Sequence, residues 1–285
     1  MTDSRRYREI GVTPLSAALG AQIDGVDLAQ PLSDSVMAEL KDAFAKYSVI
    51  FFRDQKLSPQ QHIDLAEHWG EININRFFKP LDGYPQIAEV IKAPDQKENI
   101  GGTWHTDHSY DQIPAMGSML YARQVPPVGG DTLFSSMTLA FEALSDGMKK
   151  TLLGLNAWHS SRHAFGYGVS DSEHYEDGRL ANPELAVQDA LHPVIITHPL
   201  SGKKALYVNA DFTVRFDGWT IEESRPLLDF LYAHGAREEF TCRFKWQQGS
   251  IALWDNRATW HNAMNDYHGH RRVMHRITLE GVALQ

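Results

Sequence analysis

The amino-acid sequence predicts a mainly β fold with α-helical insertions, arranged as a jelly-roll-type double sheet. Short segments rich in strand-forming residues follow one another from about residue 87 to the end of the chain. Helical patterns are few and fall between the strands, as expected for helices on the outside of two packed sheets. The 285 residues contain no repeat, low-complexity tract or linker, so we expect one domain over residues 1–285 with a flexible N-terminal tail of about ten residues.

The first part of the chain alternates strands and helices. Two strands are expected before the first helix, at 12–15 and 21–23. After Ser33, a candidate N-cap, apolar residues recur at helical spacing and predict an amphipathic helix over 34–46. The strand expected at 48–52 is almost wholly apolar, which predicts burial on both of its faces. A second helix is expected over 59–68, because proline favours the first position of a helix.

The rest of the chain has mainly strand-forming patterns. Eight expected strands share an enrichment in β-branched and aromatic residues: 87–91, 118–124, 131–135, 194–198, 204–208, 241–246, 250–254 and 272–279. Three helices are expected between them, at 137–145, 146–153 and 220–234. The stretch 166–191 is polar and turn-rich, and loops of that length in a compact domain are usually functional or mobile. We expect it to cover a pocket and to be mobile without substrate.

Composition and charge argue against several classes of function. The formal net charge is −9, which disfavours nucleic acid as a partner because phosphate binding needs clustered Lys and Arg. No stretch approaches the roughly 20 apolar residues of a membrane span, and the N-terminus lacks the apolar core of a signal peptide. Cys242 is the single cysteine, so no intramolecular disulfide can form. We therefore expect a cytoplasmic protein that binds neither nucleic acid nor membrane.

A candidate metal site begins at Trp104-His105-Thr106-Asp107. In an extended segment residues i and i+2 point to the same side, so His105 and Asp107 are able to bind one ion. For such a pair alone, a hydrogen-bonded pair on a loop is the ordinary alternative. His261, which follows a strand and a polar turn at 255–257, is the candidate third ligand. Two His and one carboxylate leave octahedral positions open, as in Fe(II) oxygenases, whereas zinc favours a tetrahedral site.

Two arginines follow the candidate third ligand. Arg272 and Arg276 are four residues apart in an expected strand, so their side chains point to the same face. A surface salt bridge is the ordinary fate of one arginine. Two guanidinium groups on one face are costly to bury without anions, and guanidinium groups pair with carboxylates through two hydrogen bonds. The pair therefore predicts a carboxylate-binding site.

These residues occur together in a known family. The chain resembles the taurine dioxygenase and 2,4-dichlorophenoxyacetate dioxygenase family of Fe(II)/2-oxoglutarate-dependent enzymes. The matching stretches lie in order between about residues 12 and 281: Leu19–Leu28, Val49–Gln55, Trp104–Asp107, Gly129–Thr132, Trp254–Arg257, His261 and Arg272–Arg276. The resemblance implies a double-stranded β-helix (jelly roll), bound Fe(II), 2-oxoglutarate as cosubstrate with O2, and a homo-oligomer, a dimer or a tetramer.

The resemblance also implies roles for individual residues. The iron ligands implied are His105, Asp107 and His261. Thr132 and Arg272 would hold the distal carboxylate of 2-oxoglutarate, while Arg276 would lie near the anionic group of the substrate and is a further candidate contact of the cosubstrate. The positions expected to line the substrate pocket are Asn75, His108, Tyr110, Phe165, Phe212 and Arg276.

The chain departs from the taurine enzymes near the expected pocket. Those enzymes have a His that contacts sulfonate in a stretch that here is Gly70–Asn75, and Asn donates hydrogen bonds but carries no charge. His108 follows the expected iron-binding Asp, and Tyr110 stands where the taurine enzymes have Phe. These differences argue against taurine, which stays the alternative. They favour hydroxylation of another small anion, an aryloxyalkanoate, another carboxylate, an alkyl sulfonate or a sulfate ester, with release of succinate and CO2.

Two other classes of function compete with this prediction. A metal-dependent hydrolase on a similar barrel would need an activated water and a general base, and it would not explain Thr132 or the two arginines. A non-catalytic barrel would have no reason to retain every expected ligand. Dependence of activity on O2 and 2-oxoglutarate distinguishes the first class, and failure to bind Fe(II) would indicate the second.

Overall fold

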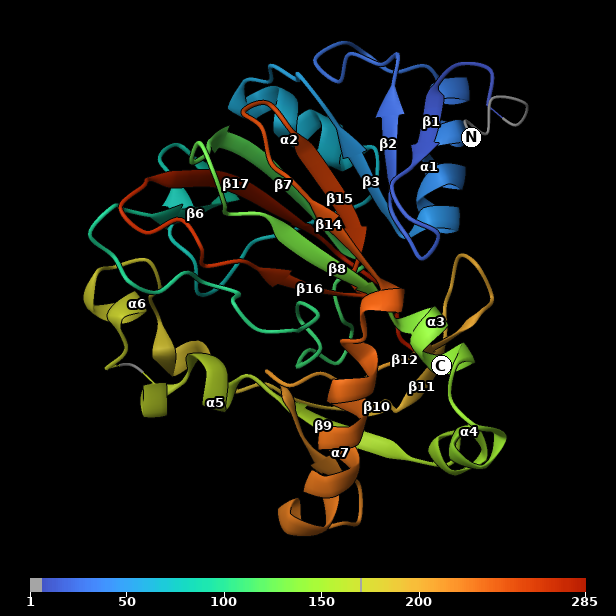
Figure 1. Cartoon of the computed structure of the whole chain (residues 1–285). Helices are drawn as coiled ribbons and strands as arrows, with labels where there is room; N and C mark the ends of the chain where they lie inside the picture. Colours follow the sequence, from blue (N-terminus) through green and yellow to red (C-terminus); the bar gives the residue numbers. More distant parts are fainter. Residues whose placement is uncertain (1–6, 170) are drawn as a thin grey trace.

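Two facing β-sheets form a jelly roll in a computed structural model that describes residues 7–169 and 171–285 (Figure 1). Within these residues the larger sheet has nine strands, with β1, β2, β3, β15, β7, β17, β6 and β5 in spatial order and β4 paired with β17. Their bounds are β1 Gly11–Pro14, β2 Ala21–Asp24, β3 Val49–Phe52, β4 Ile72–Asn73, β5 Pro80–Leu81, β6 Tyr84–Lys92, β7 Gly117–Gln124, β15 Ile251–Asp255 and β17 Arg272–Leu279. The facing sheet consists of β14 Thr241–Phe244, β8 Thr132–Ser136 and β16 Thr259–Ala263.

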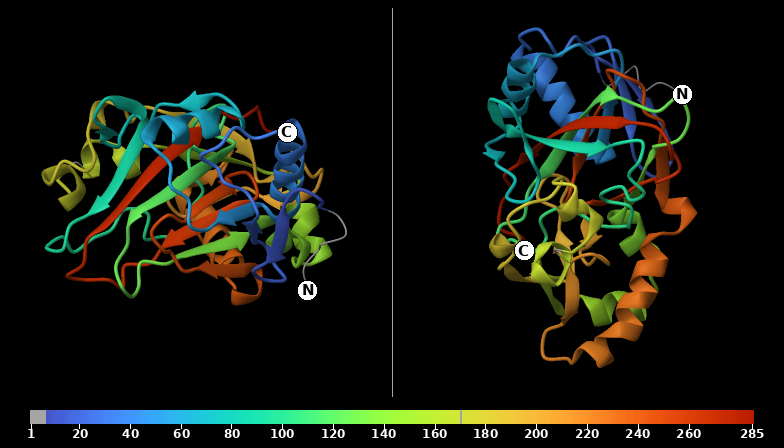
Figure 2. Two further views of the ribbon diagram at one scale, coloured as in Figure 1. Left: turned by 90° about the horizontal axis from the view of Figure 1, so that it is seen from above. Right: turned by 90° about the vertical axis from the view of Figure 1, so that its left-hand side faces the viewer.

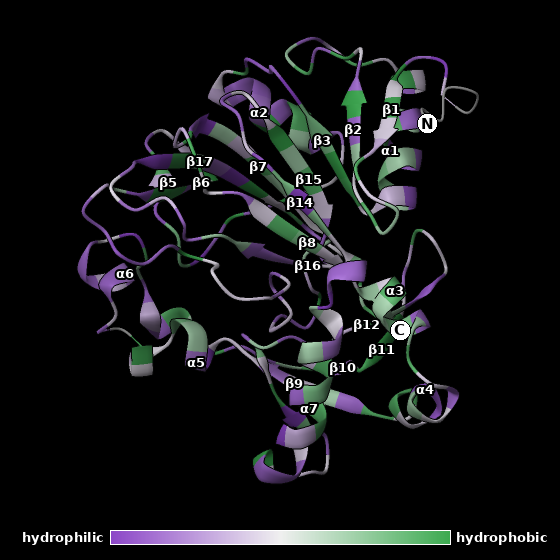
Figure 3. Ribbon diagram, viewed as in Figure 1, coloured by the Kyte–Doolittle hydropathy of each residue, from purple (hydrophilic) through white to green (hydrophobic). Residues whose placement is uncertain are grey.

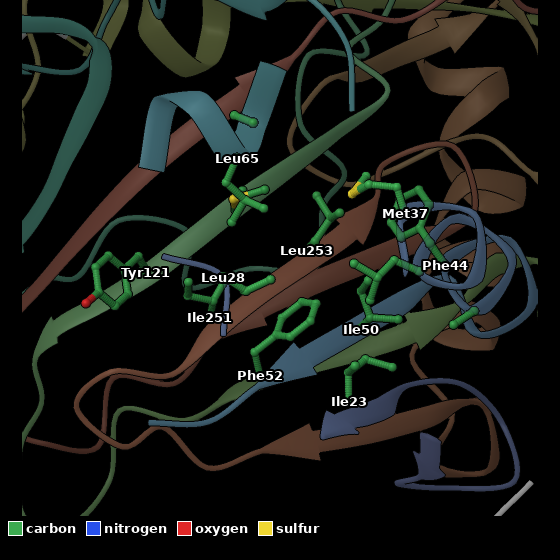
Figure 4. Packing of buried hydrophobic residues seen from close by; sticks show 14 of the residues in the cluster. Ile23, Leu28, Met37, Phe44, Ile50, Phe52, Leu65, Tyr121, Ile251 and Leu253 are labelled. Carbon is green, nitrogen blue, oxygen red and sulfur yellow. The ribbon is translucent and has the colours of Figure 1, made fainter. Parts of the chain in front are cut away.

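Helices α1 (Asp34–Tyr47) and α2 (Pro59–Glu67) cover the outer face of the larger sheet. Ser33 is the N-cap of α1, as expected, because its side chain accepts a hydrogen bond from Val36 N. In Figure 4, Met37 and Phe44 of α1 meet Ile50 of β3 and Leu253 of β15. This apolar layer fixes the outer face of the strands whose inner face forms the site.

Strand β3 contributes side chains to two apolar clusters, one on each of its faces. Ile50 and Phe52 belong to the cluster beneath α1 and α2, whereas Val49 and Phe51 belong to the cluster between the sheets. Phe51 stacks on Phe244 of β14 with 4.0 Å between the ring centroids. All four residues of β3 are buried, which confirms the prediction of burial on both faces, and Figure 3 colours this strand as hydrophobic.

A second group of elements lies at the opposite end of the molecule from α1 and α2 (Figure 2). Helix α7 (Ile221–Gly235) lies there, and Trp260 of β16 shares an apolar cluster with its Leu228 and Leu231. The other elements of this group are α3 Met137–Glu142, α4 Asp146–Leu152, β9 Asn156–Ser160, β10 Asp189–Pro193, β11 Ile195–Thr197, β12 Lys204–Leu206 and β13 Thr213–Phe216. A short 3-10 helix, η3 (Glu238–Phe240), leads into β14.

The expected loop 166–191 contains regular structure. After α5 (Arg162–Phe165), the chain forms η1 (Tyr167–Val169), α6 (Glu173–Glu176) and η2 (Pro183–Leu185) before β10 begins. Residue 170 lies outside the described residues. Figure 3 colours α6 as hydrophilic, in agreement with the polar composition of the stretch.

The predicted set of strands was incomplete. Among the described strands, six were not expected, because they are short and carry no clear strand pattern: β4, β5, β9, β10, β13 and β16. The tail expected over about ten residues lies mostly outside the described residues; in its described part, Tyr7 and Ile10 are buried and the backbone N–H groups of residues 8–10 donate to the Glu39 carboxylate of α1. Residues 1–6 lie outside the described part of the chain.

None of the helices described is long and apolar enough to cross a membrane.

Candidate active site

The three expected metal ligands come together between the two sheets. His261 lies in β16, and His105 forms an isolated bridge with it. The bridge has two backbone hydrogen bonds, from His105 N to His261 O (3.1 Å) and from His261 N to His105 O (2.8 Å). Asp107 follows two residues later, and all three residues are more than nine-tenths buried. Two segments that are distant in the sequence are therefore held together by the backbone rather than by the ligand side chains alone.

The donor atoms suit a single metal ion. His105 Nε2 lies 3.7 Å from Asp107 Oδ1, and His261 Nε2 lies 3.9 Å from Asp107 Oδ2. The three ligand atoms all lie within 4.8 Å of one another, which allows one ion to contact each of them at about 2 Å. Two imidazoles and one carboxylate match the donor set of Fe(II) oxygenases.

Charged neighbours keep Asp107 ionised in spite of its burial. Its Oδ2 accepts a hydrogen bond from Ser118 Oγ at 2.9 Å, and Arg276 Nη1 lies 3.5 Å from its Oδ1. Burial raises the pKa of Asp107, but Arg276 and the two histidines outweigh burial and hold this pKa well below its usual range. The carboxylate is therefore available as an anionic ligand at neutral pH.

The two histidines differ in their surroundings. Burial lowers the pKa of His105, but the adjacent carboxylates of Asp107 and Asp211 outweigh burial and raise this pKa to about 9. Burial and the neighbouring His105 lower the pKa of His261 to about 3. A ligand imidazole must be neutral, so metal binding would displace a proton from His105.

Next to the metal ligands, the two sheets provide a candidate carboxylate site. Arg272 of β17 is 5% exposed, and burial lowers the pKa of its guanidinium. Among the described residues, its Nε and Nη2 atoms have no hydrogen-bond partner. Thr132 of the facing strand β8 accepts a hydrogen bond from Trp246 Nε1 at 2.9 Å, which leaves its own hydroxyl hydrogen to donate. A carboxylate between these two side chains would satisfy both, so the residues fit the distal end of 2-oxoglutarate.

One cavity of about 390 Å³ joins the metal ligands to the expected substrate residues. All of the predicted site residues line it: Asn75, His105, Asp107, His108, Tyr110, Thr132, Phe165, Phe212, His261, Arg272 and Arg276. Its aromatic wall is built by Tyr110, whose ring lies 4.9 Å from that of Phe212, and by Phe165, which stacks on Phe77 at 4.4 Å. The volume suits a small organic molecule.

His108 faces this cavity from a strained backbone. Its φ of 58° lies in the left-handed region, which few residues other than glycine adopt. The side chain is buried, and its Nδ1 lies 3.1 Å from Asp111 Oδ2, while Asp111 pairs with Arg76 at 2.6 Å. Within the described chain, His108 Nε2 has no hydrogen-bond partner. The imidazole is thus fixed on one side and leaves a polar atom for a ligand.

Asn75 lines the cavity and also stabilises a turn of the backbone. Its Oδ1 accepts hydrogen bonds from the backbone N–H groups of Phe77 and Phe78, both at 2.9 Å. These bonds fix the turn that places Phe78 beneath Arg276, whose guanidinium carbon lies 4.3 Å from the Phe78 ring centroid. The amide nitrogen of Asn75 is the part of the side chain left for a substrate.

Several residues that line the cavity were not predicted from the sequence. Asp211, His163, His174 and Leu180 line it, and Asp211 also lies 3.6 Å from His105 Nδ1. Asp211 is separated from His105 by more than one hundred residues and belongs to no motif with it. The polar character of 166–191 was the signal for His174 and Leu180, but it did not distinguish individual residues.

A jelly roll that encloses two His, one carboxylate and a buried arginine defines the class of 2-oxoglutarate-dependent dioxygenases, within the non-haem Fe(II) oxygenases. The chain matches the model of the family described as "Taurine catabolism dioxygenase TauD, TfdA family" over residues 11–278. It belongs to this family.

Relatives and solved structures support the assignment along nearly the whole chain. An alpha-ketoglutarate-dependent sulfate ester dioxygenase of Pseudomonas putida is 31% identical, with 96% of this chain and 90% of the relative covered. An alpha-ketoglutarate-dependent 2,4-dichlorophenoxyacetate dioxygenase of Cupriavidus pinatubonensis is 32% identical, with 93% and 96% covered. A taurine dioxygenase structure from Burkholderia xenovorans is similar with a TM-score of 0.82 at 34% identity, covering 97% of this chain and 91% of that chain.

Proposed function

We propose that this dioxygenase uses Fe(II), 2-oxoglutarate and O2 to hydroxylate a small anionic organic substrate, with release of succinate and CO2. The observation that carries the proposal is the single cavity in which His105, Asp107 and His261 meet the buried Arg272. Among the described residues, two guanidinium nitrogens of Arg272 have no hydrogen-bond partner. A buried cation without a partner favours the binding of an anion next to the metal ligands. A crystal structure of AAD-2 contains Mn(II) and N-oxalylglycine, an analogue of 2-oxoglutarate. AAD-2 is similar to this chain with a TM-score of 0.78 at 28% identity, and the match covers 96% of this chain and 98% of that chain.

Each group of site residues would have its own function. His105, Asp107 and His261 would hold iron, which together with 2-oxoglutarate and O2 supplies the oxidant for a C–H bond. Arg272 and Thr132 would bind the distal carboxylate of 2-oxoglutarate and so fix its other end toward the metal. The buried side chains around this end would exclude water from the reacting groups.

Arg276 would set the position of the substrate. Its Nη1 lies 3.5 Å from the metal ligand Asp107, and its Nε has no hydrogen-bond partner among the described residues. An anionic group that pairs with Arg276 would therefore place the neighbouring carbon atoms close to the metal. Tyr110, Phe165 and Phe212 would enclose the apolar part of the substrate, and Asn75 and His108 would offer it hydrogen bonds.

For the substrate we propose an aryloxyalkanoate, another carboxylate, an alkyl sulfonate or a sulfate ester. Relatives that span nearly the whole chain act on a sulfate ester and on 2,4-dichlorophenoxyacetate, according to their names. These substrates share a small anionic group on an organic body, which agrees with a cavity that combines arginine with aromatic side chains. Taurine is the alternative, and the departures at Asn75 and His108 argue against it.

Anaerobic titration with Fe(II) and 2-oxoglutarate tests the proposal. We expect the weak visible charge-transfer band of the chelate, and we expect one class of anion to shift the band and to release succinate when air is admitted. The variant Asp107→Ala serves as the control and should lose the band. A protein that holds zinc and ignores 2-oxoglutarate would overturn the proposal in favour of a metal-dependent hydrolase.

We further propose that the protein is a cytoplasmic homo-oligomer, a dimer or a tetramer, with no nucleic-acid or membrane partner. The reduced, buried thiol of Cys242 is compatible with a reducing compartment, and the net charge of −9 disfavours nucleic acid. The oligomeric state is supported by the family resemblance. Light scattering on the purified protein tests it, and a monomeric mass would contradict it.

A further inference from the structure

The imidazole of His105 is held on the side that faces away from the other metal ligands. Its Nε2 lies 3.7 Å from Asp107 Oδ1, whereas its Nδ1 lies 2.8 Å from the backbone oxygen of Thr103. Since a backbone oxygen only accepts, Nδ1 carries the hydrogen and donates it to Thr103. This leaves the lone pair of Nε2 for the metal.

Asp211 supports this arrangement from a distant part of the chain. It lies between β12 and β13, and both of its carboxylate oxygens accept a hydrogen bond from Thr103 Oγ1, at 2.6 and 2.7 Å. Its Oδ2 also lies 3.6 Å from His105 Nδ1. Thr103 is therefore fixed by its hydroxyl to Asp211 while its carbonyl oxygen accepts from His105.

The charge of Asp211 has no other evident partner. In the part of the chain that the structure describes, no Lys or Arg forms an ion pair with Asp211, and its side chain is 26% exposed. The neighbouring Phe212 has its ring 6.3 Å from that of His105 at an interplanar angle of 79°. Asp211 thus holds its place beside the imidazole through contacts with the metal-binding segment itself.

The second histidine ligand lacks such support. His261 Nδ1 is buried and has no hydrogen-bond partner among the residues described. A carboxylate behind a ligand imidazole fixes its tautomer and orientation and makes the opposite nitrogen a stronger donor to the metal. Support of this kind would make His105 the stronger metal donor of the two histidines.

We propose that Asp211 is a positioning residue for the metal site, acting through Thr103 and through its charge beside His105 Nδ1. This inference rests on the proposed function of His105 as a metal ligand. Carboxylates in this position typically contribute ten- to hundredfold to metal affinity. Because Asp211 also lines the substrate cavity, it couples the cavity wall to the metal ligand.

The variant Asp211→Asn tests the proposal, because Asn keeps the shape of the side chain and removes the charge. We expect its Fe(II) and Co(II) dissociation constants to rise roughly ten- to hundredfold and the charge-transfer band with 2-oxoglutarate to shift in wavelength. Asp217→Asn is the matched control: this exposed carboxylate six residues on accepts a hydrogen bond from Trp158 Nε1 at 2.8 Å. The control should change metal affinity less than twofold.

Thr103→Val provides a second test if Asp211→Asn fails to fold, as judged from the melting temperature of the metal-free protein. It removes the hydroxyl that holds Asp211 but keeps the backbone oxygen that accepts from His105, so we expect weaker metal binding in the same direction. Wild-type affinity and an unshifted band in both variants, or in Thr103→Val alone if Asp211→Asn does not fold, would overturn the inference. A wild-type protein that binds no Fe(II) would instead overturn the proposed function.

Discussion

Arg272 and Arg276 point into the same cavity but have different partners. Arg276 lies against Asp107 and above the Phe78 ring, so part of the cost of burying its charge is already offset. The guanidinium carbon of Arg272 lies 5.8 Å from the centroid of the Trp246 ring. Within the described chain, its Nε and Nη2 atoms have no hydrogen-bond partner. The two residues should therefore respond differently to substitution.

Arg272→Met should weaken 2-oxoglutarate binding most. The substitution keeps much of the apolar stem and removes the charge-assisted hydrogen bonds, which contribute about 3 kcal/mol, or roughly a hundredfold in affinity. Calorimetric titration of the metal-loaded protein with N-oxalylglycine measures the loss. Arg271→Met, at the exposed neighbouring position, is the control and should bind like the wild type.

Arg276→Ala should lower kcat/KM for the organic substrate more than it lowers 2-oxoglutarate affinity, because we assign Arg276 to the substrate anion. Steady-state kinetics and a separate 2-oxoglutarate titration give the two quantities. An equal loss of both would assign Arg276 to the cosubstrate instead.

His108→Asn should raise KM for the substrate about tenfold, the effect of one lost hydrogen bond, while 2-oxoglutarate affinity stays unchanged. Asn is chosen because it tolerates the positive φ of 58° at this position, so the backbone should be retained. Unchanged KM would show that the Nε2 atom of His108 does not contact the substrate.

At the scale of elements, the turn between β15 and β16 depends on a buried ionic network. Asp255 accepts hydrogen bonds from Arg257 Nε at 2.9 Å and Nη2 at 2.7 Å, and His198 Nε2 lies 2.9 Å from its Oδ2. Burial raises the pKa of Asp255, but Arg257 and His198 outweigh it and hold this pKa well below its usual range. The network fixes the path of the chain that brings His261 to the metal site.

Asp255→Asn should destabilise the fold by about 3–5 kcal/mol at neutral pH, because it leaves Arg257 buried without its anion. The folded-state pKa of Asp255 lies below the unfolded value of about 3.9, so its stabilisation is complete above that pH and is lost as the pH falls further. Urea unfolding from pH 7 to pH 3 should show the difference between wild type and variant shrinking below about pH 4.

The control for this prediction is the exposed pair on α7, Arg225 and Asp229, at 3.8 Å with side chains 63% and 59% exposed. Asp229→Asn should change the free energy of unfolding by less than about 0.5 kcal/mol, because solvent screens exposed pairs. A similar cost for both variants would mean that burial of the Asp255 network contributes nothing.

At the scale of the whole molecule, the site lies where the two sheets and the 166–191 segment meet. Phe165, His174 and Leu180 close one side of the cavity. The segment is held to residues 96–98 by polar contacts, including Glu173 with Lys97 N at 2.9 Å and Arg179 with Glu98 O at 2.7 Å. Leu180 and Ala186 are buried in the apolar cluster with Phe77 and Phe212, but most other described residues of the segment are half-buried or exposed, so its local stability should depend on what fills the cavity.

We expect the amides of 171–191 to exchange hydrogen faster than those of β15 and β17 without ligand, and to become protected when 2-oxoglutarate and substrate bind. Hydrogen exchange measured by mass spectrometry in both states checks this prediction. Protection equal to that of the sheets in the free protein would show that the segment is fixed and forms no lid.

Local patterns predicted much of the fold. Helix α1 was expected at 34–46 and lies at Asp34–Tyr47, and the apolar strand at 48–52 is buried on both faces. Such elements are predictable because their signals, a cap, a hydrophobic period or an apolar run, lie within a few residues. The short strands β9, β13 and β16 carry no such signal and form because neighbouring strands pair with them.

Local spacing in the sequence predicted the side chains of the candidate site. The spacing of His105 and Asp107, the position of His261 and the two arginines on one face predicted a metal and a carboxylate site, because backbone geometry alone relates residues two or four apart. The three-dimensional fold brings these groups together and supplies the side chains that support them. Asp211 lies beside His105, and Asp111 with Arg76 fixes His108, only because separate segments fold against one another. Contacts between distant segments depend on packing of the whole chain, and no local spacing encodes them.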